Sequence, residues 1–351
     1  MPDIQVWRVQ KAGSLGRIRL ESDPPGPVQA GHVRVRVRAI GLNFADVFAC
    51  LGLYSATPAG PFVPGLEFCG EVDALGAGVP GPAVGTAVMG LTRFGAYATR
   101  VDVPAVYLHP LPAGWTFEEG AAYPVQAITA WYAIHDLGAC KPGQSVLVHS
   151  AAGGVGLNAL EILATLDARV IATVGRPDKV AFLTGRAGLR PEQIIVRDRR
   201  RFGDQLGDAL RASGLDGFDL VLDAVAGPFL KPAYARLRPA GRLVIYGSAG
   251  LMTGGSRPNW LTLGSRYLAR PRLDPIQMVT DNKSVMGFNL IWLWHQSARL
   301  GQAYADLAAT ITRPPHVSER FAFADAPAAL RRLQSGASVG KVVLVVEPDA
   351  R

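Results

Sequence analysis

A glycine cluster placed directly after a short apolar segment constrains this chain most. Residues 145–149 read Ser-Val-Leu-Val-His, and residues 150–156 read Ser-Ala-Ala-Gly-Gly-Val-Gly before a helical pattern begins. A buried strand that turns through small residues into a helix lets the backbone approach a pyrophosphate, whose charge the helix N-terminal amides stabilise. The segment therefore predicts a dinucleotide-binding loop, and a merely structural tight turn is the alternative. The residues expected to hold the cofactor here are Ala151, Gly153, Gly154, Val155 and Gly156.

From about residue 121 onward, the pattern of apolar and polar residues predicts an α/β domain. Uninterrupted apolar strands alternate with amphipathic helices that begin near residues 154, 177 and 229, which is typical of a doubly wound parallel sheet covered on both faces. The Gly-, Pro- and Arg-rich stretch 248–275 is expected to be a long loop, and 292–310 has helical spacing. The expected strands are 145–149, 169–174, 193–196, 218–222, 241–246 and 284–289.

The first 120 or so residues predict a β-rich domain. Turn signals at 24–26, 64–65 and 80–82 divide them into short strands. In 33–38, valine alternates with arginine, so the arginines share one face of a strand. These arginines could bind a polyanion, but a solvated outer face of an antiparallel sheet is the preferred interpretation.

Length indicates two domains, because 351 residues exceed the size at which one hydrophobic core usually stops growing. The segment 340–346 is expected to be a last strand that returns to the first domain. We predict one domain over 1–123 together with 290–351, and a dinucleotide-binding domain over 124–289.

The net charge bears on which partners the chain binds, and the cysteine content bears on where in the cell it acts. The net charge of +8 suggests an anionic cofactor or substrate, since no helix-turn-helix, RNA-recognition or zinc-finger pattern accompanies it and no nucleic-acid partner is expected. The three cysteines form no CxxC pair, which favours a reduced, cytoplasmic protein. No apolar run long enough to span a membrane and no signal-peptide pattern are found, so neither a membrane span nor secretion is expected.

The residues after the second predicted strand of the α/β domain favour NADP(H). About twenty residues past the glycine loop, where NAD-binding chains carry an acid for the ribose 2′-hydroxyl, this chain has Gly175 followed by Arg176 and Lys179. Cations there suit the extra phosphate of NADP(H), and Arg197 after the third strand adds another. In the alternative interpretation both loop cations are solvated and Asp178 holds the ribose of NAD(H).

Five motifs together carry a family resemblance over nearly the whole chain. They are Gly41-Leu-Asn-Phe-Ala-Asp46, Gly52-Leu-Tyr54, Pro61-Phe-Val-Pro-Gly-Leu-Glu67, Ser150-Ala-Ala-Gly-Gly-Val-Gly156 and Gly340-Lys-Val-Val-Leu344. The chain resembles the medium-chain dehydrogenases/reductases, in particular the zinc-free quinone oxidoreductase and VAT-1-like branch. The resemblance implies a GroES-like catalytic domain, a Rossmann domain, a cofactor cleft between them, and a homodimer formed by joining Rossmann sheets edge to edge.

The resemblance also tests for zinc. Alcohol dehydrogenases of this family place a cysteine ligand where this chain has Asn43 and a histidine ligand where it has Leu66. Neither an amide nor a leucine is a plausible zinc ligand, and the run of four close cysteines that holds a structural zinc is missing. No metal is therefore expected.

Without zinc, hydride transfer is most useful on a carbon conjugated to a carbonyl. The product of such an attack is an enolate, which needs hydrogen-bond donors at its oxygen and later a proton at carbon. The resemblance places Asn43 and Tyr54 at that oxygen, with Gln126 and Thr129 beside the nicotinamide. Tyr54 can donate a hydrogen bond or a proton, whereas Asn43 can donate only a hydrogen bond. The structural alternatives are a barrel-edge tyrosine and an Asx turn.

The acceptor is predicted less sharply. Phe48 and Cys50 stand where quinone reductases often carry tyrosine and arginine, so the pocket is expected to be less polar than theirs. A cationic rim near the long loop could hold the phosphates of a coenzyme A thioester, or could simply solubilise the loop. The residues of that expected rim are Arg266, Arg270, Arg272 and Lys283.

We therefore expect an NADPH-dependent reductase of a quinone, an enone or an enoyl-CoA thioester. The alternatives are an enoyl-CoA reductase that uses NADH and a catalytically silent NADPH-binding protein that acts through its surface. Three further polar residues are expected to be structural: Asp46 holding its loop, Glu67 hydrogen-bonding within the fold, and His149 buried in its strand.

Overall fold

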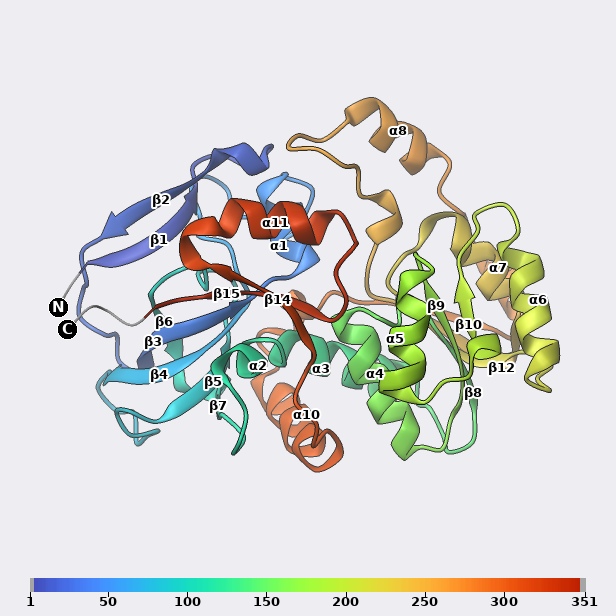
Figure 1. Ribbon diagram of the computed structural model, residues 1–351, viewed down its shortest axis with the longest axis horizontal. Coiled ribbons are helices and arrows are strands. Elements are labelled where there is room, and N and C mark those ends of the chain that lie inside the picture. Colours follow the sequence, from blue (N-terminus) through green and yellow to red (C-terminus); the bar gives the residue numbers. More distant parts are fainter. Residues whose placement is uncertain (1–2, 348–351) are drawn as a thin grey trace.

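Two sheets organise the molecule, as the computed structural model shows over residues 3–347. Figure 1 shows a β-rich half in blue and teal at one end and a parallel sheet with its helices at the other. The red C-terminal segment returns to the β-rich half, as the sequence predicts. None of the helices of the described chain has the length and apolar character needed to cross a membrane.

The second half is a doubly wound parallel sheet with the strand order β10-β9-β8-β11-β12-β13. The alternating pattern is confirmed, because all neighbouring strands pair in parallel and every residue of β8 is buried. The carboxyl ends of these strands share one edge, where such sheets bind ligands. The strands are β8 (Ser145–Val148), β9 (Arg169–Val174), β10 (Ile194–Val196), β11 (Phe218–Asp223), β12 (Leu237–Ile245) and β13 (Ser284–Gly287). The connecting helices are α4 (Gly154–Thr165), α5 (Asp178–Ala187), α6 (Phe202–Ala212) and α7 (Leu230–Ala235), with the short turns η4 (Pro191–Gln193) and η5 (Gly227–Phe229).

The prediction of a long loop over 248–275 is wrong. The stretch contains η6 (Ala249–Leu251) and α8 (Trp260–Leu268), and α9 (Pro275–Asp281) begins at its end. Asn259 caps α8 by accepting a hydrogen bond from the Thr262 amide, and Asp274 caps α9 in the same way. These cap residues were the helix signal, and the surrounding glycines and prolines obscured it.

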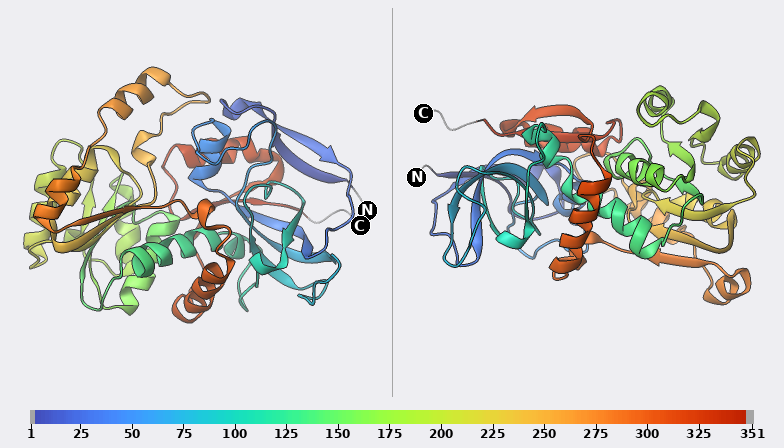
Figure 2. Two further views of the ribbon diagram at one scale, coloured as in Figure 1. Left: turned by 180° about the vertical axis from the view of Figure 1, so that it is seen from behind. Right: turned by 90° about the horizontal axis from the view of Figure 1, so that it is seen from below.

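The first half is built on a sheet with the order β14-β15-β3-β4-β5-β7, to which β6 adds by pairing with β3, and on a separate β1-β2 hairpin. Figure 2 shows these strands from behind and from below, with α11 lying over them. The strands are β1 (Ile4–Val9), β2 (Ile18–Asp23), β3 (His32–Gly41), β4 (Glu67–Leu75), β5 (Ala87–Leu91), β6 (Arg100–Pro104), β7 (Leu108–Pro110), β14 (Val317–Ala322) and β15 (Lys341–Val345). The helices and helical turns are α1 (Phe44–Cys50), α2 (Phe117–Ala121), α11 (Ala326–Gln334), η1 (Leu15–Arg17), η2 (Ala105–Tyr107) and η8 (Phe323–Asp325).

The arginines of β3 are not the solvated face that the alternation suggests. The valines between them are buried as expected, but Arg34 is buried too and pairs with Asp102 of β6 at 2.8 Å. Arg38 pairs with Glu71 of β4 at 2.7 Å. Acids on the two neighbouring strands therefore compensate these cations, a complement that no local pattern in β3 reveals.

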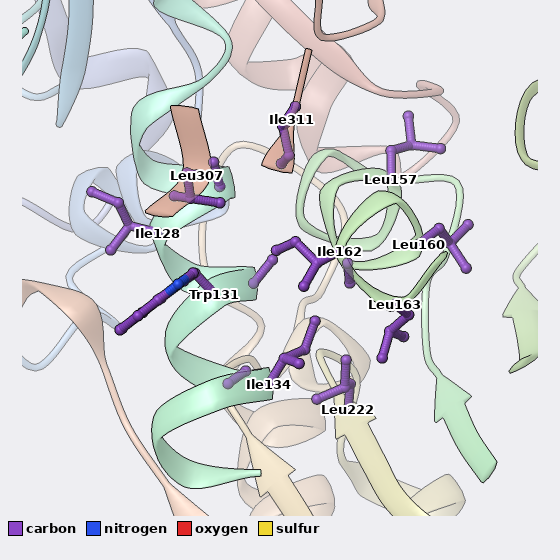
Figure 3. Packing of buried hydrophobic residues seen from close by; sticks show 14 of the residues in the cluster. Ile128, Trp131, Ile134, Leu157, Leu160, Ile162, Leu163, Leu222, Leu307 and Ile311 are labelled. Carbon is purple, nitrogen blue, oxygen red and sulfur yellow. The ribbon is translucent and has the colours of Figure 1, made fainter. Parts of the chain in front are cut away.

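A shared core joins the two halves. In Figure 3, apolar side chains of α3 (Pro124–Trp131), α4 and α10 (Ser297–Thr310) belong to one cluster, with Leu222 of β11 at its lower edge near Ile134 and Ile162. The turns η3 (Tyr132–Leu137) and η7 (Leu290–Leu293) continue α3 and precede α10. The same cluster includes Met89 and Leu91 of β5. This core fixes the position of the cleft between the halves, and the predicted domain boundaries near residues 123 and 290 stay a prediction.

Candidate functional site

A cleft of about 1120 Å³ runs between the two halves. One wall is the edge formed by the carboxyl ends of the parallel strands, from the glycine loop to the residues after β12. The opposite wall comes from α1, the segment around Tyr54, the turn after β5, and α11 with the loop that follows it. Its place at this edge of the sheet makes it the candidate site.

The glycine loop lies where the sequence predicts it. Gly153 precedes α4 directly, so the N-terminal amides of the helix open into the cleft. A Cβ at Gly156 would lie 2.6 Å from Ala151 Cα, and a Cβ at Gly154 would lie 2.7 Å from Gln126 Oε1. The loop residues from Gly153 to Gly156 line the cleft, while Ala151 is buried beneath it. These residues fit the diphosphate of a dinucleotide.

Two of the three cations predicted for the adenosine end reach the cleft, next to Gly175. Lys179 Nζ donates to the carbonyls of Gly336 and Ser338 at 2.9 and 2.7 Å, and burial lowers the pKa of this amine. Arg197 Nη1 donates to Thr173 Oγ1 at 2.8 Å, and burial lowers its pKa to about 10.

Arg176, the third predicted cation, points elsewhere. It is exposed, pairs with Asp178 at 3.1 Å and does not line the cleft. Because Asp178 is held by that pair, it does not supply a carboxylate at the ribose position in this arrangement. The structure therefore gives the adenosine end a net positive lining.

Unpartnered polar atoms lie buried beside this end of the cleft. His149 Nδ1 is 3.1 Å from Thr173 Oγ1, while His149 Nε2 has no hydrogen-bond partner among residues 3–347. Burial lowers the pKa of His149 to about 4, so the ring is neutral. Asp223 accepts backbone hydrogen bonds through Oδ1, and its Oδ2 is unpartnered, as is the hydroxyl of Tyr246. Such atoms at the ends of neighbouring strands fit a site completed by a polar ligand.

At the other end, Asn43 belongs to a buried hydrogen-bond network. Its Nδ2 donates to Glu67 Oε1 at 2.9 Å and to the Gly41 carbonyl at 3.3 Å. Its Oδ1 accepts from Gln126 Nε2 and, at 3.2 Å, from Lys341 Nζ. Both amide hydrogens are therefore used within the protein, so Asn43 orients Gln126 in this arrangement and presents no free donor to an acceptor. Sequence reasoning had expected such a donor.

Lys341 is the functional-site residue that the sequence analysis missed. Its ammonium is buried and lies 2.7 Å from Glu67 Oε1, and it also donates to the Leu42 carbonyl at 2.6 Å. Glu67 has no exposed surface and accepts from the Val125 amide through its other oxygen. The available signal was a lysine inside the apolar run of β15, which requires a buried counter-ion.

Tyr54 faces the cleft from the segment after α1. Its hydroxyl donates to Asn289 Oδ1 at 2.9 Å, and burial raises the pKa of the phenol to about 12. The group is therefore a neutral hydrogen-bond donor at physiological pH. Thr129 and Gln126 line the same region. The apolar side chains around it are Phe44, Phe48, Leu53, Leu66, Leu91, Phe288, Leu290, Ile291 and Trp294.

Asp46 lies below this pocket. Its Oδ2 accepts from the Asn43 amide at 2.8 Å and from the Tyr97 hydroxyl at 3.1 Å. Burial raises the pKa of Asp46 to about 7. The carboxyl holds the start of α1, as the sequence analysis expects, and it does not line the cleft.

The residues at the expected zinc positions do not fit that metal. The side-chain amide of Asn43 is hydrogen-bonded within the buried network, and the side chain of Leu66 has no atom that could coordinate a metal ion. In the part of the chain that the structure describes, no three His, Cys, Asp or Glu side chains converge to hold a metal ion.

The cationic rim expected near the long loop does not line the cleft. Arg266 donates to the Met252 carbonyl at 2.7 Å, and Arg270 lies over the ring of Tyr267. Lys283 donates to backbone carbonyls at the end of α7. Neither these three nor Arg272 are among the lining residues, so the choice between a phosphate-binding rim and a solubilising basic loop stays a prediction. Their side-chain directions depend on α8 and α9, which the sequence analysis did not foresee.

The segment 248–256 crosses from the parallel-sheet half to the β-rich half. The Leu15 amide donates to the Ser256 carbonyl at 2.9 Å, and Gln334 Nε2 donates to the carbonyls of Thr253 and Gly255. In Figure 1 this segment extends from α8 toward the blue N-terminal turn. Several of its residues, including Ser248 and Met252, line the cleft and cover one side of it.

Comparisons with known proteins agree with this architecture. The zinc-binding dehydrogenase family model matches residues 193–344, and the alcohol dehydrogenase GroES-like domain model matches residues 29–113. The human synaptic vesicle membrane protein VAT-1 homolog is 34% identical over 345 residues, which cover 96% of this chain and 85% of that protein.

Solved structures match along nearly the whole chain. The quinone oxidoreductase from Thermus thermophilus, solved also in complex with NADPH, is 30% identical, with a TM-score of 0.76 and coverage of 97% of this chain and 99% of that one. The CurK enoyl reductase is 26% identical, with a TM-score of 0.80 and coverage of 99% and 100%.

Proposed function

The chain belongs to the medium-chain dehydrogenase/reductase superfamily, and from that premise we propose that it is an NADPH-dependent, zinc-independent reductase of carbon–carbon double bonds conjugated to a carbonyl. One observation carries the proposal: a single cleft joins the glycine loop and two cations at one end to a neutral pocket around Tyr54 at the other. A polyanionic hydride donor and an acceptor whose conjugated double bond and carbonyl are uncharged are the pair that such a cleft suits.

The cation pair at the adenosine end supports NADPH over NADH. Lys179 and Arg197 are within the lining, and a 2′-phosphate placed between them would replace the weaker carbonyl and hydroxyl partners that these side chains now have. A relative of similar fold was solved with NADPH. The use of NADH remains the alternative, and it requires the ribose to be held without an acid such as Asp178.

When bound in the cleft, NADPH would supply a hydride to the carbon β to the carbonyl, and a proton from solvent on the α carbon would complete the saturated product. Tyr54, whose hydroxyl donates to Asn289 here, would exchange that partner for the carbonyl oxygen as negative charge develops there, and its high pKa keeps the phenol protonated. Asn43, held by Lys341 and Glu67, fixes Gln126 against the glycine loop, and Thr129 lies beside it. The apolar walls exclude water from the reacting carbons.

Quinones, enones and enoyl thioesters all present the required conjugated system. Phe48 in the lining makes the pocket less polar, which favours apolar acceptors. Cys50, the other departure considered, is buried and does not line the cleft. The family resemblance supports a homodimer, which light scattering of the purified protein would test, and the cysteine usage supports a cytoplasmic location.

The test is NADPH oxidation by the purified protein against a panel of quinones, 2-alkenals and enoyl-CoA thioesters, with and without a chelator. We expect turnover of at least one class, insensitive to the chelator and faster with NADPH than with NADH. Tight NADPH binding without turnover of any class would contradict the proposal and favour a protein that acts through its surface.

A further inference from the structure

The acceptor end of the cleft is neutral, but its mouth carries one cation. Among the described residues that line the acceptor half, the only charged side chain is Lys341, whose charge Glu67 cancels. Arg93 lies just outside the lining, directly after Leu91 and Thr92, which are part of it. It was not among the cations that the sequence analysis singled out.

Arg93 sits against the opposite wall of the mouth. Its guanidinium carbon is 5.3 Å from the centre of the Trp292 ring, and Trp292 follows Leu290 and Ile291 of the lining. The indole itself is 53% exposed. The contact between Arg93 and Trp292 therefore connects the turn after β5 with η7, and both of these segments supply residues to the lining of the acceptor half.

The guanidinium of Arg93 has no protein anion to neutralise it. Over the described residues, no carboxylate, carbonyl or hydroxyl forms a hydrogen bond or ion pair with it, and the side chain is half-buried. Stacking on an aromatic face leaves the edge N–H groups free for a bidentate contact with a carboxylate or a phosphate. Partial burial strengthens such a contact because fewer waters screen the charge.

The charge of Arg93 also acts on Tyr54, the residue proposed to contact the acceptor. It acts to lower the pKa of Tyr54, against the larger effect of burial, so the two side chains are electrostatically coupled. An acceptor that touches Tyr54 with its carbonyl therefore has Arg93 within its electrostatic reach.

We infer that Arg93, held by Trp292, is a subsite for an anionic group that the acceptor carries remote from its conjugated double bond. This rests on the proposed function and narrows it: the preferred acceptors are anionic rather than neutral. The anion is a carboxylate on the acceptor itself or the phosphate of a carrier such as coenzyme A, and both share the chemistry of a planar or tetrahedral oxyanion.

Matched acceptor pairs test the subsite. Crotonyl-CoA carries a phosphorylated nucleotide that crotonyl-N-acetylcysteamine lacks, with the same acyl group, while 6-oxo-4-heptenoate and its methyl ester differ in a carboxylate two methylenes away from the conjugated double bond. We expect Arg93→Gln to raise KM for the anionic member of a pair by about 10- to 100-fold, the loss of a charged hydrogen bond, and to leave the neutral member within about twofold. Arg270→Gln is the matched control, since Arg270 also lies over an aromatic ring, but neither Arg270 nor its neighbours in the sequence are among the lining residues, whereas Leu91 and Thr92 beside Arg93 are.

The possible outcomes identify the source of the anion, and they distinguish a failure of the subsite from a failure of the proposed function. An effect confined to the thioester pair identifies the phosphate, and one confined to the oxo-acid pair identifies the carboxylate. Equal effects of Arg93→Gln on both members of each pair would overturn the subsite. If the unaltered protein turns over neither these compounds nor any class of the panel above, the proposed function fails. The subsite is then decided by calorimetric binding of butyryl-CoA and 6-oxoheptanoate to the NADPH complex, which Arg93→Gln must weaken for at least one ligand; unchanged binding of both overturns it.

Discussion

The two ends of the cleft handle charge in opposite ways. At the end next to Gly175, Lys179 and Arg197 line the cleft; among the described residues they hydrogen-bond only to carbonyl and hydroxyl oxygens, and the guanidinium carbon of Arg197 also lies 5.5 Å from the ring centre of Phe229. At the opposite end the buried ammonium of Lys341 is matched by Glu67, and the other described side chains that line this end are neutral. Under the proposed function, the first end would hold a ligand whose charge is permanent, and the second would stabilise charge that exists only during the reaction.

The largest effect that tests this contrast concerns the buried pair. Lys341→Met leaves the Glu67 carboxylate buried without a counter-ion, so we expect a loss of about 3–5 kcal/mol in the free energy of unfolding. The double variant Lys341→Met/Glu67→Gln removes both charges and should recover more than half of that loss. Chemical denaturation measures both.

An exposed pair is the control for this cycle. Arg332→Met breaks the ion pair of Arg332 with Glu319, which lies at 2.7 Å near the surface, and should cost less than about 1 kcal/mol. If the double variant at Lys341 and Glu67 is as unstable as the single one, charge cancellation is not what this end of the cleft is built for.

The second-largest expected effect is on kcat and concerns the hydroxyl of Tyr54. Tyr54→Phe removes the donor proposed for the developing oxyanion, and we expect kcat to fall by about 100-fold with little change in NADPH affinity. Tyr107→Phe is the matched control, because its hydroxyl donates to the Trp294 carbonyl and does not line the cleft. Steady-state kinetics with a saturating acceptor give the comparison, and an unchanged kcat removes Tyr54 from the mechanism.

The third-largest expected effect is on cofactor affinity and concerns Lys179 and Arg197. Lys179→Ala or Arg197→Gln should weaken NADPH by about 10- to 100-fold and NADH by less than about threefold, because only NADPH carries the extra phosphate. Lys283→Ala is a matched control, since Lys283 also donates to two backbone carbonyls but lies away from the cleft. Titration by fluorescence gives both affinities, and equal losses for the two cofactors would point to NAD(H).

The pH dependence of stability should differ in sign between the two ends. The pKa of His149 is lowered to about 4, so the unfolded chain binds more protons than the folded one between about pH 4 and 6.5. Its contribution to stability is therefore present above that range and is lost on acidification. The pKa of Asp46 is raised to about 7, so the folded chain binds more protons between about pH 4 and 7, and its contribution falls as pH rises.

Variants isolate the two contributions, each with a slope of at most about 1.4 kcal/mol per pH unit. Between about pH 4 and 6.5, His149→Gln should make the free energy of unfolding rise less steeply with pH. Between about pH 4 and 7, Asp46→Asn should make the free energy of unfolding fall less steeply with pH. Urea midpoints at pH 4 to 7.5 test this. Slopes that neither substitution changes would mean that these groups titrate alike in the folded and unfolded chains.

Much of the fold follows from local sequence patterns. The glycine loop, the alternation of apolar strands with helices and the returning last strand all rest on residues close together in the chain, and the structure has them where the patterns predict. The helix α8 was missed because its cap, Asn259, stands among glycines and prolines that are typical of loops.

The candidate site depends more on contacts between distant residues. Lys341 meets Asn43 and Glu67 across 298 and 274 positions of sequence, and no local pattern indicates such a meeting. The directions of the cations also differ from the prediction: Arg176 pairs with Asp178 away from the cleft, while Arg93, which no motif marks, lies over the ring of Trp292. Residue type predicted which chemistry is available, whereas tertiary packing decided which groups are free to perform it.

The position of the transferred hydride tests the central claim most directly. The protein is given NADPH deuterated at nicotinamide C4 and an enone that it turns over, and the product is analysed by NMR. The account predicts a saturated ketone with deuterium on the carbon β to an intact carbonyl. Deuterium on the carbonyl carbon of an alcohol would contradict it.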